Sequence, residues 1–270
     1  MKVLIGFLFL FSINLTFSQL YTPGSGVTDV DGNNYPTIII NGQEWMADNL
    51  RTSKYANGDP IPNVTDNFQW ENLTTGAWAH YNNDSQYENP YGKLYNWYTT
   101  ADSRKVCPIG WHVPSDEEYT LLIDYLGGEF VAGGKMKSTG TQYWVSPNTD
   151  ATNESGFSGL PGGLRYGPFS GIGRVGLWWS STDYNSCCAW GRGLLYDGDF
   201  VFRDDGTSMM QGYSIRCMKE STSGLNLINP SPKKLVKILN VMGQESSIKS
   251  NELLFYLYDD GSIEKKITVE

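Results

Sequence analysis

Two cysteines far apart in the sequence place the strongest constraint on how this chain can fold. Cys107 opens the segment Cys107–Glu118, and Cys217 closes the run Ser214–Cys217. A disulfide between them would enclose about 110 residues and contribute about 4–5 kcal/mol to stability in the chain-entropy model. Four cysteines allow three pairings. We favour Cys107–Cys217 because this pair brackets the folded unit.

The other two cysteines, Cys187 and Cys188, are adjacent in sequence. Three states stay open for them, namely a vicinal disulfide, two free thiols or a link to another chain. The simplest interpretation is a locally oxidised loop without a function of its own.

The first 18 residues are typical of a secretory signal. Lys2 supplies the positive start, Val3 to Phe17 is mostly apolar, and Ser18 is a small residue before a cut. That apolar run is short for a membrane span, and no later run is longer, so we expect no transmembrane segment. Gln19 follows the cut where a lipoprotein would carry cysteine. The sequence therefore predicts export, followed by a leader at 19–34.

The composition favours short strands and many turns over long helices. The 270 residues include 30 Gly and are 14% aromatic, with 9 Trp and 17 Tyr. Most of these aromatics are expected in the core, and a minority could form a binding platform. The net charge of −9 argues against a nucleic-acid partner, which would require clustered Lys and Arg.

Two local patterns predict elements directly. Asn41-Gly42 between Thr37–Ile40 and Gln43–Met46 predicts a hairpin. Ser115 followed by Glu118 forms a capping box, so a helix should begin there and end at Gly127-Gly128. A second, weaker helix is expected over Leu94–Ala101.

The rest of the main region reads as turns and strands. Residues 57–90 are polar and suit a segment with little regular structure, and the glycine-rich stretch 133–176 lacks the ending of a phosphate-binding loop. Strand-like runs are expected at Leu177–Ser180, Cys188–Leu195, Asp199–Arg203 and Tyr213–Met218. Their spacing suggests an antiparallel sheet, and the fold class expected is α+β.

A composition shift at 221–228 predicts a linker to a small separate β unit. Its expected strands are Leu235–Leu239, Leu253–Tyr258 and Ile263–Val269, with a turn at Asp259–Gly261.

Six ordered blocks carry a family resemblance. They are Gly42–Leu50, Tyr91–Trp97, Cys107–Glu118, Asn153–Ser158, Trp178–Thr182 and Ile215–Cys217. Together they resemble the Fibrobacter succinogenes major paralogous domain, placed here at 35–220. The resemblance implies a C-type lectin-like fold with short helices and antiparallel strands, in an exported protein. Cys187-Cys188 is not part of the pattern.

The C-terminal region carries a second resemblance. Pro230–Pro232, Val241–Glu245 and Leu254–Lys266 look like a short type A sorting domain of the type IX secretion system, placed here at 229–270. This resemblance implies passage across the outer membrane by the type IX machinery, removal of the tail, and a secreted or cell-surface location.

Residues for catalysis are scarce. His80 and His112 are the only histidines, so a zinc site or a Ser-His-Asp triad has little to build from. His112 is expected to be a packed structural side chain. Formylglycine-generating enzymes use a similar frame with a cysteine pair, but Cys187-Cys188 has the wrong spacing. We expect no enzyme activity and no cofactor.

The sequence leaves a calcium site open but does not support one. Asp197-Gly198-Asp199 and Asp204-Asp205-Gly206 supply oxygen ligands of the kind that calcium prefers, yet such sequences also simply form turns.

The sequence therefore favours a binding or adhesion module for a glycan or a surface protein. The expected contact segment is 181–206, where aromatic faces, arginine and acids could bind a ligand. Its candidate residues are Tyr184, Trp190, Arg192, Tyr196, Asp197 and Asp199. A structural cell-envelope protein and, less favoured, a lectin-fold enzyme are the alternatives.

Overall fold

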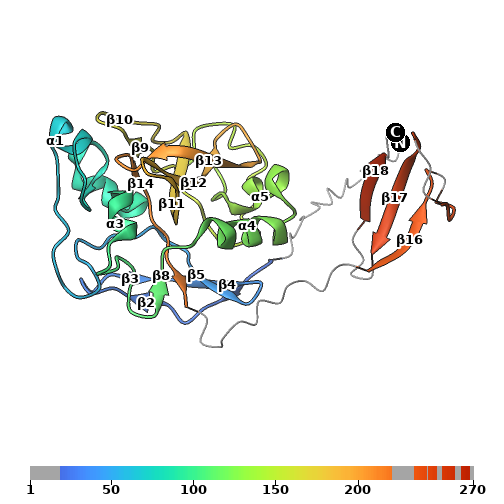
Figure 1. The fold of residues 1–270 in the computed structure, drawn as a ribbon, viewed down its shortest axis with the longest axis horizontal. Helices are drawn as coiled ribbons and strands as arrows, with labels where there is room; N and C mark the ends of the chain where they lie inside the picture. Colours follow the sequence, from blue (N-terminus) through green and yellow to red (C-terminus); the bar gives the residue numbers. More distant parts are fainter. Residues whose placement is uncertain (1–18, 221–233, 242, 248–250, 259–262, 268–270) are drawn as a thin grey trace, which may run out of the picture. The chain divides into compact units, whose positions relative to one another are not determined.

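A computed structural model describes residues 19–220, 234–241, 243–247, 251–258 and 263–267 (Figure 1). The chain divides into two compact units, one within residues 1–220 and one within 221–270. The expected signal at 1–18 and linker at 221–228 lie outside the described residues. Within the described part, no helix has both the length and the apolar character needed to cross a membrane.

The main unit is α+β, and its first sheet joins the beginning of the unit to its end. In spatial order this antiparallel sheet contains β1 (Thr22–Pro23), β4 (Thr37–Ile40), β5 (Gln43–Met46), β15 (Met218–Lys219) and β8 (Trp111–His112). Asn41 and Gly42 join β4 to β5 with positive φ angles of 48° and 76°. Such a turn matches the twist of the strands, and the predicted hairpin is confirmed.

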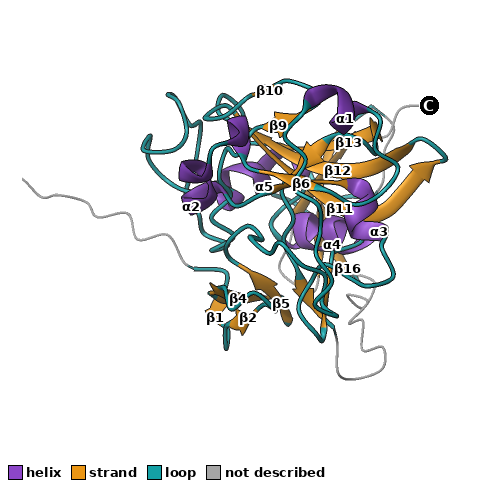
Figure 2. Cartoon of the chain, turned by 90° about the vertical axis from the view of Figure 1, so that its left-hand side faces the viewer, coloured by secondary structure: helices purple, strands orange, loops and turns teal. Residues whose placement is uncertain are grey.

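The second sheet lies on the opposite side of the unit (Figure 2). Its order is β10 (Phe169–Ser170), β9 (Leu164–Arg165), β14 (Gly212–Tyr213), β7 (Leu94–Asn96) and β6 (Trp78–Ala79). The helix expected over 94–101 is wrong in its first half, because β7 pairs with β6 and β14. Only α3 (Trp97–Ala101) is helical. Sheet pairing here overrides the helical spacing of Tyr95 and Tyr98.

The third sheet contains the longest strands of the unit. It contains β11 (Val175–Asn185), β12 (Cys188–Leu195) and β13 (Val201–Ser208), all antiparallel. Strand β12 has the predicted bounds, β11 is longer than predicted at both ends, and β13 begins two residues later and ends five residues later than predicted. The strand expected at 213–218 is divided between β14 and β15, which belong to different sheets. A small pair, β2 (Val27–Thr28) with β3 (Asn34–Tyr35), precedes β4.

Two helices lie against this third sheet (Figure 1). Helix α4 (Asp116–Tyr125) begins with the predicted capping box of Ser115 and Glu118 and ends before Gly127. Helix α5 (Glu129–Met136) was not predicted, because Gly133 and Gly134 are poor helix formers.

The polar segment 57–90 holds more short elements than expected. They are α1 (Asn67–Glu71), α2 (Glu88–Tyr91) and the 3₁₀ turns η1 (Tyr81–Asn83) and η2 (Ser85–Tyr87).

Aromatic side chains fill the interior. Eight of the nine tryptophans are buried, and Trp190 alone is partly exposed. Cys107 and Cys217 are also buried and form the disulfide favoured from the sequence. The bond links the segment just before β8 to the residue before β15, so the C-terminal end of the unit is fastened to the middle of its chain.

The C-terminal unit is a three-stranded antiparallel sheet. Its strands are β16 (Leu235–Leu239), β17 (Leu253–Tyr258) and β18 (Ile263–Ile267), with β17 in the centre. The predicted strands are present, while the turn at 259–261 lies outside the described residues. Leu254 and Tyr256 of β17 are buried.

Candidate functional site

Only Tyr184 and Trp190, of the six predicted contact residues, meet in the structure. Tyr184 is near the end of β11 and Trp190 near the start of β12, with ring centroids 4.9 Å apart and rings nearly perpendicular at 85°. The guanidinium carbon of Arg203 lies 3.6 Å from the centroid of the Trp190 ring. We call Tyr184, Trp190 and Arg203 the hairpin surface. Arg203 was not among the predicted contact residues.

Asp116 fixes the position of Arg203 in the hairpin surface. Its carboxylate accepts two hydrogen bonds from Arg203, from Nε at 3.2 Å and from Nη2. These bonds raise the pKa of Arg203. The backbone N–H of Asp116 in turn donates to Oγ1 of Thr182 in β11 at 3.0 Å. The first residue of α4 therefore fixes the position of an arginine on a neighbouring strand.

Arg192 is not a surface residue, and its assignment to the contact surface was wrong. It is buried, with 3% of the residue exposed, and its Nη2 lies 2.7 Å from Oδ1 of Asp116. The same nitrogen donates to Oγ1 of Thr120 at 2.7 Å. Arg192 and Arg203 are direct partners across β12 and β13. Two like charges opposite each other repel, so the shared Asp116 carboxylate compensates for both.

Tyr196, Asp197 and Asp199 lie away from the hairpin surface. They belong to the turn that follows the C-terminal end of β12 and leads into β13, whereas Trp190 lies near the N-terminal end of β12. Six residues of extended strand separate Trp190 from Tyr196 by about 20 Å. Tyr196 has the guanidinium carbon of Arg174 5.3 Å from its ring centroid. A single contact surface with all six predicted residues is therefore excluded.

A lysine fills the interior of this turn. Lys137 is fully buried, and its Nζ donates to the carbonyls of Gly198 and Thr149, each at 2.7 Å, and of Leu195 at 3.2 Å. Burial lowers the pKa of Lys137 to about 8, against the opposing effect of nearby aspartates. The carbonyls that face inward here are already bound to an ammonium group of the protein.

The described residues offer no ready metal site. Within the described ranges, no three His, Cys, Asp or Glu side chains form a group suited to a metal ion. The second Asp-Gly segment, Asp204–Gly206, lies within strand β13 and not in a turn, and Asp204 accepts a hydrogen bond from the hydroxyl of Tyr213 at 2.7 Å.

Cys187 and Cys188 form a vicinal disulfide at the tip of the β11–β12 hairpin. Cys187 is exposed, and its backbone N–H donates to Oδ1 of Asn185 at 2.9 Å. Of the three states left open by the sequence, the structure contains this one.

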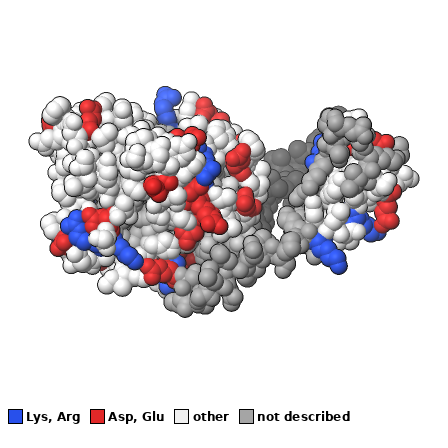
Figure 3. Space-filling view, in the orientation of Figure 1, with Lys and Arg blue, Asp and Glu red and all other residues white. Residues whose placement is uncertain are grey.

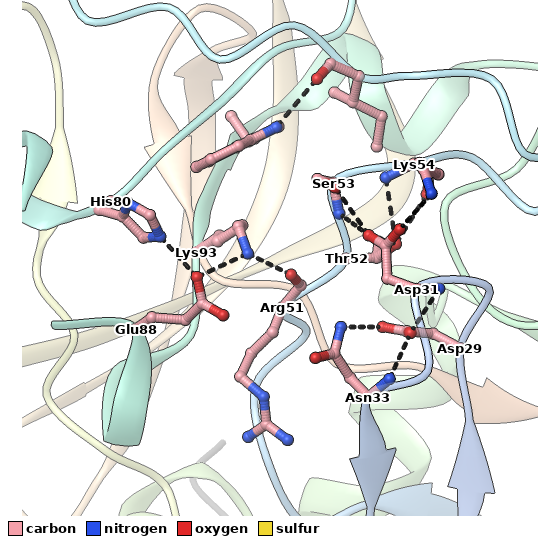
Figure 4. A network of polar contacts seen from close by, with 12 residues as sticks. Asp29, Asp31, Asn33, Arg51, Thr52, Ser53, Lys54, His80, Glu88 and Lys93 are labelled. Carbon is pink, nitrogen blue, oxygen red and sulfur yellow. Dashed lines mark hydrogen bonds and ion pairs between the residues drawn. The ribbon is translucent and has the colours of Figure 1, made fainter. Parts of the chain in front are cut away.

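Both histidines pair with glutamates. Nε2 of His80 lies 2.6 Å from Oε2 of Glu88, which also accepts from Nζ of Lys93 at 2.8 Å (Figure 4). Burial opposes ionisation of Glu88, but Lys93 and His80 outweigh it, and the pKa of Glu88 is lowered. Nε2 of His112 contacts both carboxylate oxygens of Glu118 at 3.0 and 3.1 Å. His112 therefore supports the beginning of α4 while 29% of its side chain stays exposed.

An acidic loop that the sequence analysis overlooked is used to fasten the chain to itself (Figure 4). Asp29 accepts from the backbone of Asp31 and Asn33, at 3.0 and 2.9 Å. Asp31 accepts from Ser53 and forms an ion pair with Lys54 at 3.0 Å. The alternating spacing of these polar residues was the available signal. N–H and O–H donors face the carboxylates, so the loop is built for internal bonding.

The family motifs meet in the core. Oδ1 of Asn49 accepts from Nε1 of Trp178 and Nε of Arg216, both at 2.9 Å. Arg216, fully buried, also donates to the carbonyls of Phe157 and Ser158. The motif residues therefore specify the scaffold. The hairpin surface and the vicinal disulfide lie outside them.

Charges on the surface do not gather into a basic patch on the face shown in Figure 3, where Asp and Glu are spread widely among uncharged residues.

Comparison with known proteins identifies the scaffold. No curated protein and no solved structure matches the chain. The family model of the Fibrobacter succinogenes major domain matches residues 38–219, which include all six blocks from Gly42–Leu50 to Ile215–Cys217. The chain belongs to the Fibrobacter succinogenes major domain family.

Proposed function

We propose that this protein is an exported, non-catalytic binding module whose hairpin surface contacts a protein partner. One observation carries the proposal: Trp190 is the only tryptophan that is not buried, and it is held between Tyr184 and an arginine fixed by Asp116. Trp, Tyr and Arg are the residue types that dominate the energetics of protein interfaces. A rigid, partly exposed group of all three suits such a contact.

A protein partner fits this surface better than a sugar. Stacking on a sugar requires an open aromatic face, whereas Arg203 lies over one face of the Trp190 ring. The side chain of Arg203 is 49% exposed, Asp183 is exposed next to Tyr184 in sequence, and Asp205 is exposed two positions after Arg203. This arrangement, with partly buried aromatics and charges around them, resembles the centre and rim of a protein interface.

Export by the type IX system is part of the proposal. It is supported by the signal-like residues 1–18, by the resemblance of the C-terminal region to a type A sorting domain, and by the compact β16–β18 sheet. The disulfides are consistent with an oxidising compartment outside the cytoplasm. The C-type lectin-like fold is likewise proposed, on the family resemblance together with the mixed α+β architecture.

The binding test uses the purified protein and outer-membrane fractions of the producing strain. Tyr184→Ala and Arg203→Ala should each weaken capture at least about five-fold if they are interface anchors. Tyr125→Ala, at 45% exposure against 49% for Tyr184, is the matched control and should have no effect. Proteinase treatment of the fractions should abolish capture. Capture that resists proteinase but is lost after periodate oxidation would replace the protein partner with a glycan.

Equal capture of all variants, or no capture at all, would favour a structural envelope protein. Turnover of a substrate would revive the enzyme alternative.

The export test removes residues 221–270. The main unit should remain folded, because it is compact by itself, and it should accumulate in the periplasm. Surface display equal to that of the full chain would refute the sorting role.

A further inference from the structure

A second surface, separate from the hairpin surface, forms a shallow hollow of about 540 Å³. Its volume falls within the range of about 300–1,000 Å³ typical of small-ligand sites. It is lined by Thr65, Asp66, Asn67, Asn82, Asn83, Pro168 and Phe169. We call it the Asn82 hollow. It lies at the edge where α1 and β10 come together (Figure 2).

Arg165 makes the walls of the hollow rigid. The residue is fully buried, and its guanidinium donates to the carbonyls of Val64 and Thr65 and to Oδ1 of Asn67. Its Nε donates to the carbonyl of Gly167 at 3.3 Å. The walls on both sides of the hollow are therefore bound to one side chain. Because these donors are used internally, Arg165 does not offer its charge to a ligand.

Phe169 and Asn83 complete the lining of the hollow. The Phe169 ring has the guanidinium carbon of Arg165 4.7 Å from its centroid and the Tyr81 ring at 5.4 Å. Nδ2 of Asn83 donates to the carbonyl of Thr65 at 3.0 Å, which ties η1 to the opposite wall. Phe169 is half-buried, so part of an apolar surface stays open to the hollow.

Several polar groups remain free for a ligand. Asn82 is exposed, with φ at 52°, and its amide makes no hydrogen bond to any described residue. Oδ1 of Asp66 accepts from the backbone of Gln69, which leaves Oδ2 without a partner in the described part of the chain. An amide supplies both donors and an acceptor, and a carboxylate oxygen accepts from hydroxyl groups.

We propose that the Asn82 hollow binds a neutral oligosaccharide. Amide and carboxylate groups suit the hydroxyls of a sugar, and the part of the Phe169 ring that Arg165 and Tyr81 leave uncovered offers an apolar contact without full ring stacking. Asp66 carries the only formal charge among the lining residues, so an anionic ligand is disfavoured.

The neighbouring segments extend this surface. Phe68 is 76% exposed beside Asn67, and Tyr166 is 57% exposed two residues before Pro168. A ligand longer than one sugar could reach further apolar contacts on either segment. This inference goes beyond the proposed function, because it concerns a different surface and a different class of ligand.

Calorimetric titration of the full chain tests the inference. The probes are cellohexaose, laminarihexaose and xylohexaose, with hexagalacturonate as the charged counterpart. Asn82→Gly removes the amide and keeps the left-handed backbone, and it should weaken binding of a neutral probe about five-fold or more. Asp66→Asn retains a helix-capping side chain and should also weaken binding.

The matched control is Asn41→Gly. Asn41 is likewise exposed with a positive φ, 48°, but lies in the β4–β5 turn, and its substitution should leave affinity within about two-fold. Trp190→Ala should do the same, which separates this inference from the proposed function.

The inference is overturned if no neutral probe binds with Kd below about 10 mM. It is equally overturned if Asn82→Gly has no effect, or if hexagalacturonate binds as tightly as the neutral probes.

Discussion

Arg216 and Asn49 form a buried hydrogen bond across 167 sequence positions. Nε of Arg216 lies 2.9 Å from Oδ1 of Asn49, and Nε1 of Trp178 donates to the same oxygen. An amide oxygen has two lone pairs, and both are used here. Three separate motif blocks therefore meet at one amide in the core.

Replacement of Asn49 by alanine should destabilise the main unit strongly. It would leave the buried donors of Trp178 and Arg216 without their shared acceptor, and each such loss costs about 1–3 kcal/mol. We expect the free energy of unfolding in urea to fall by about 3–4 kcal/mol. Asn63→Ala, at an exposed position, should stay within about 0.5 kcal/mol. A similar small effect for both would contradict the structural role of Asn49.

The elements that the sequence predicted correctly depend on neighbouring residues. The Asn41-Gly42 turn and the capping box of Ser115 and Glu118 could be predicted, because the residues that fix the backbone there are close in sequence. Residues 94–96 instead become a strand through pairing with distant segments. Helix α5 was missed for the same reason, since its glycines are explained only by what packs against them.

Gly133→Ala should destabilise the protein although alanine is the better helix former. A Cβ at this position would lie 2.4 Å from the carbonyl oxygen of Phe200. The gain in helix propensity is about 1 kcal/mol, whereas overpacking typically costs about 1–3 kcal/mol. We expect a net loss of up to about 2 kcal/mol in chemical denaturation, because the cost of overpacking exceeds the gain in helix propensity. Val131→Ala, on the exposed side of the same helix, is the control. An increase in stability for Gly133→Ala would show that the close packing can relax.

The candidate site was only partly visible in the sequence. Alternation along β12 places Trp190 and Arg192 on one face, but nothing in the sequence reveals that α4 covers only the second of them. Arg203 was overlooked because its partner, Asp116, lies 87 positions away.

Trp190→Ala should reduce stability moderately. The substitution removes the contact with Arg203 and the perpendicular ring contact with Tyr184, each worth about 0.5–1.5 kcal/mol. We expect a loss of about 1–2 kcal/mol, against about 3–5 kcal/mol for the fully buried Trp178→Ala. Thermal and urea denaturation of the two variants distinguish these cases. Equal losses would assign Trp190 to the core and weaken the proposed hairpin surface.

The two disulfides should differ sharply in their effect on stability. Cys107 and Cys217 are 110 positions apart, whereas Cys187 and Cys188 are adjacent. In the chain-entropy model the first contributes about 4–5 kcal/mol, and the second closes almost no loop. The double Cys→Ser variant at 107 and 217 should therefore lose most of its stability. The double Cys→Ser variant at 187 and 188 should have a free energy of unfolding close to that of the wild type. Peptide mapping without reductant checks both pairings, and free thiols at 107 and 217 would contradict the structure.

Asp31 should make stability fall in acid. Burial opposes its ionisation, but donors from Ser53 and Lys54 outweigh that effect and lower its pKa from 3.8 to about 2. Because the folded protein binds this proton less readily, the contribution is complete above about pH 3.8 and is lost as the pH falls toward 2. Solvent screening keeps it to about 1 kcal/mol. Urea unfolding of wild type and Asp31→Asn should differ at pH 5–7 and converge near pH 2, and Lys54→Met should remove part of the same difference. A difference that stays constant over this pH range would show that the carboxylate charge does not stabilise the loop.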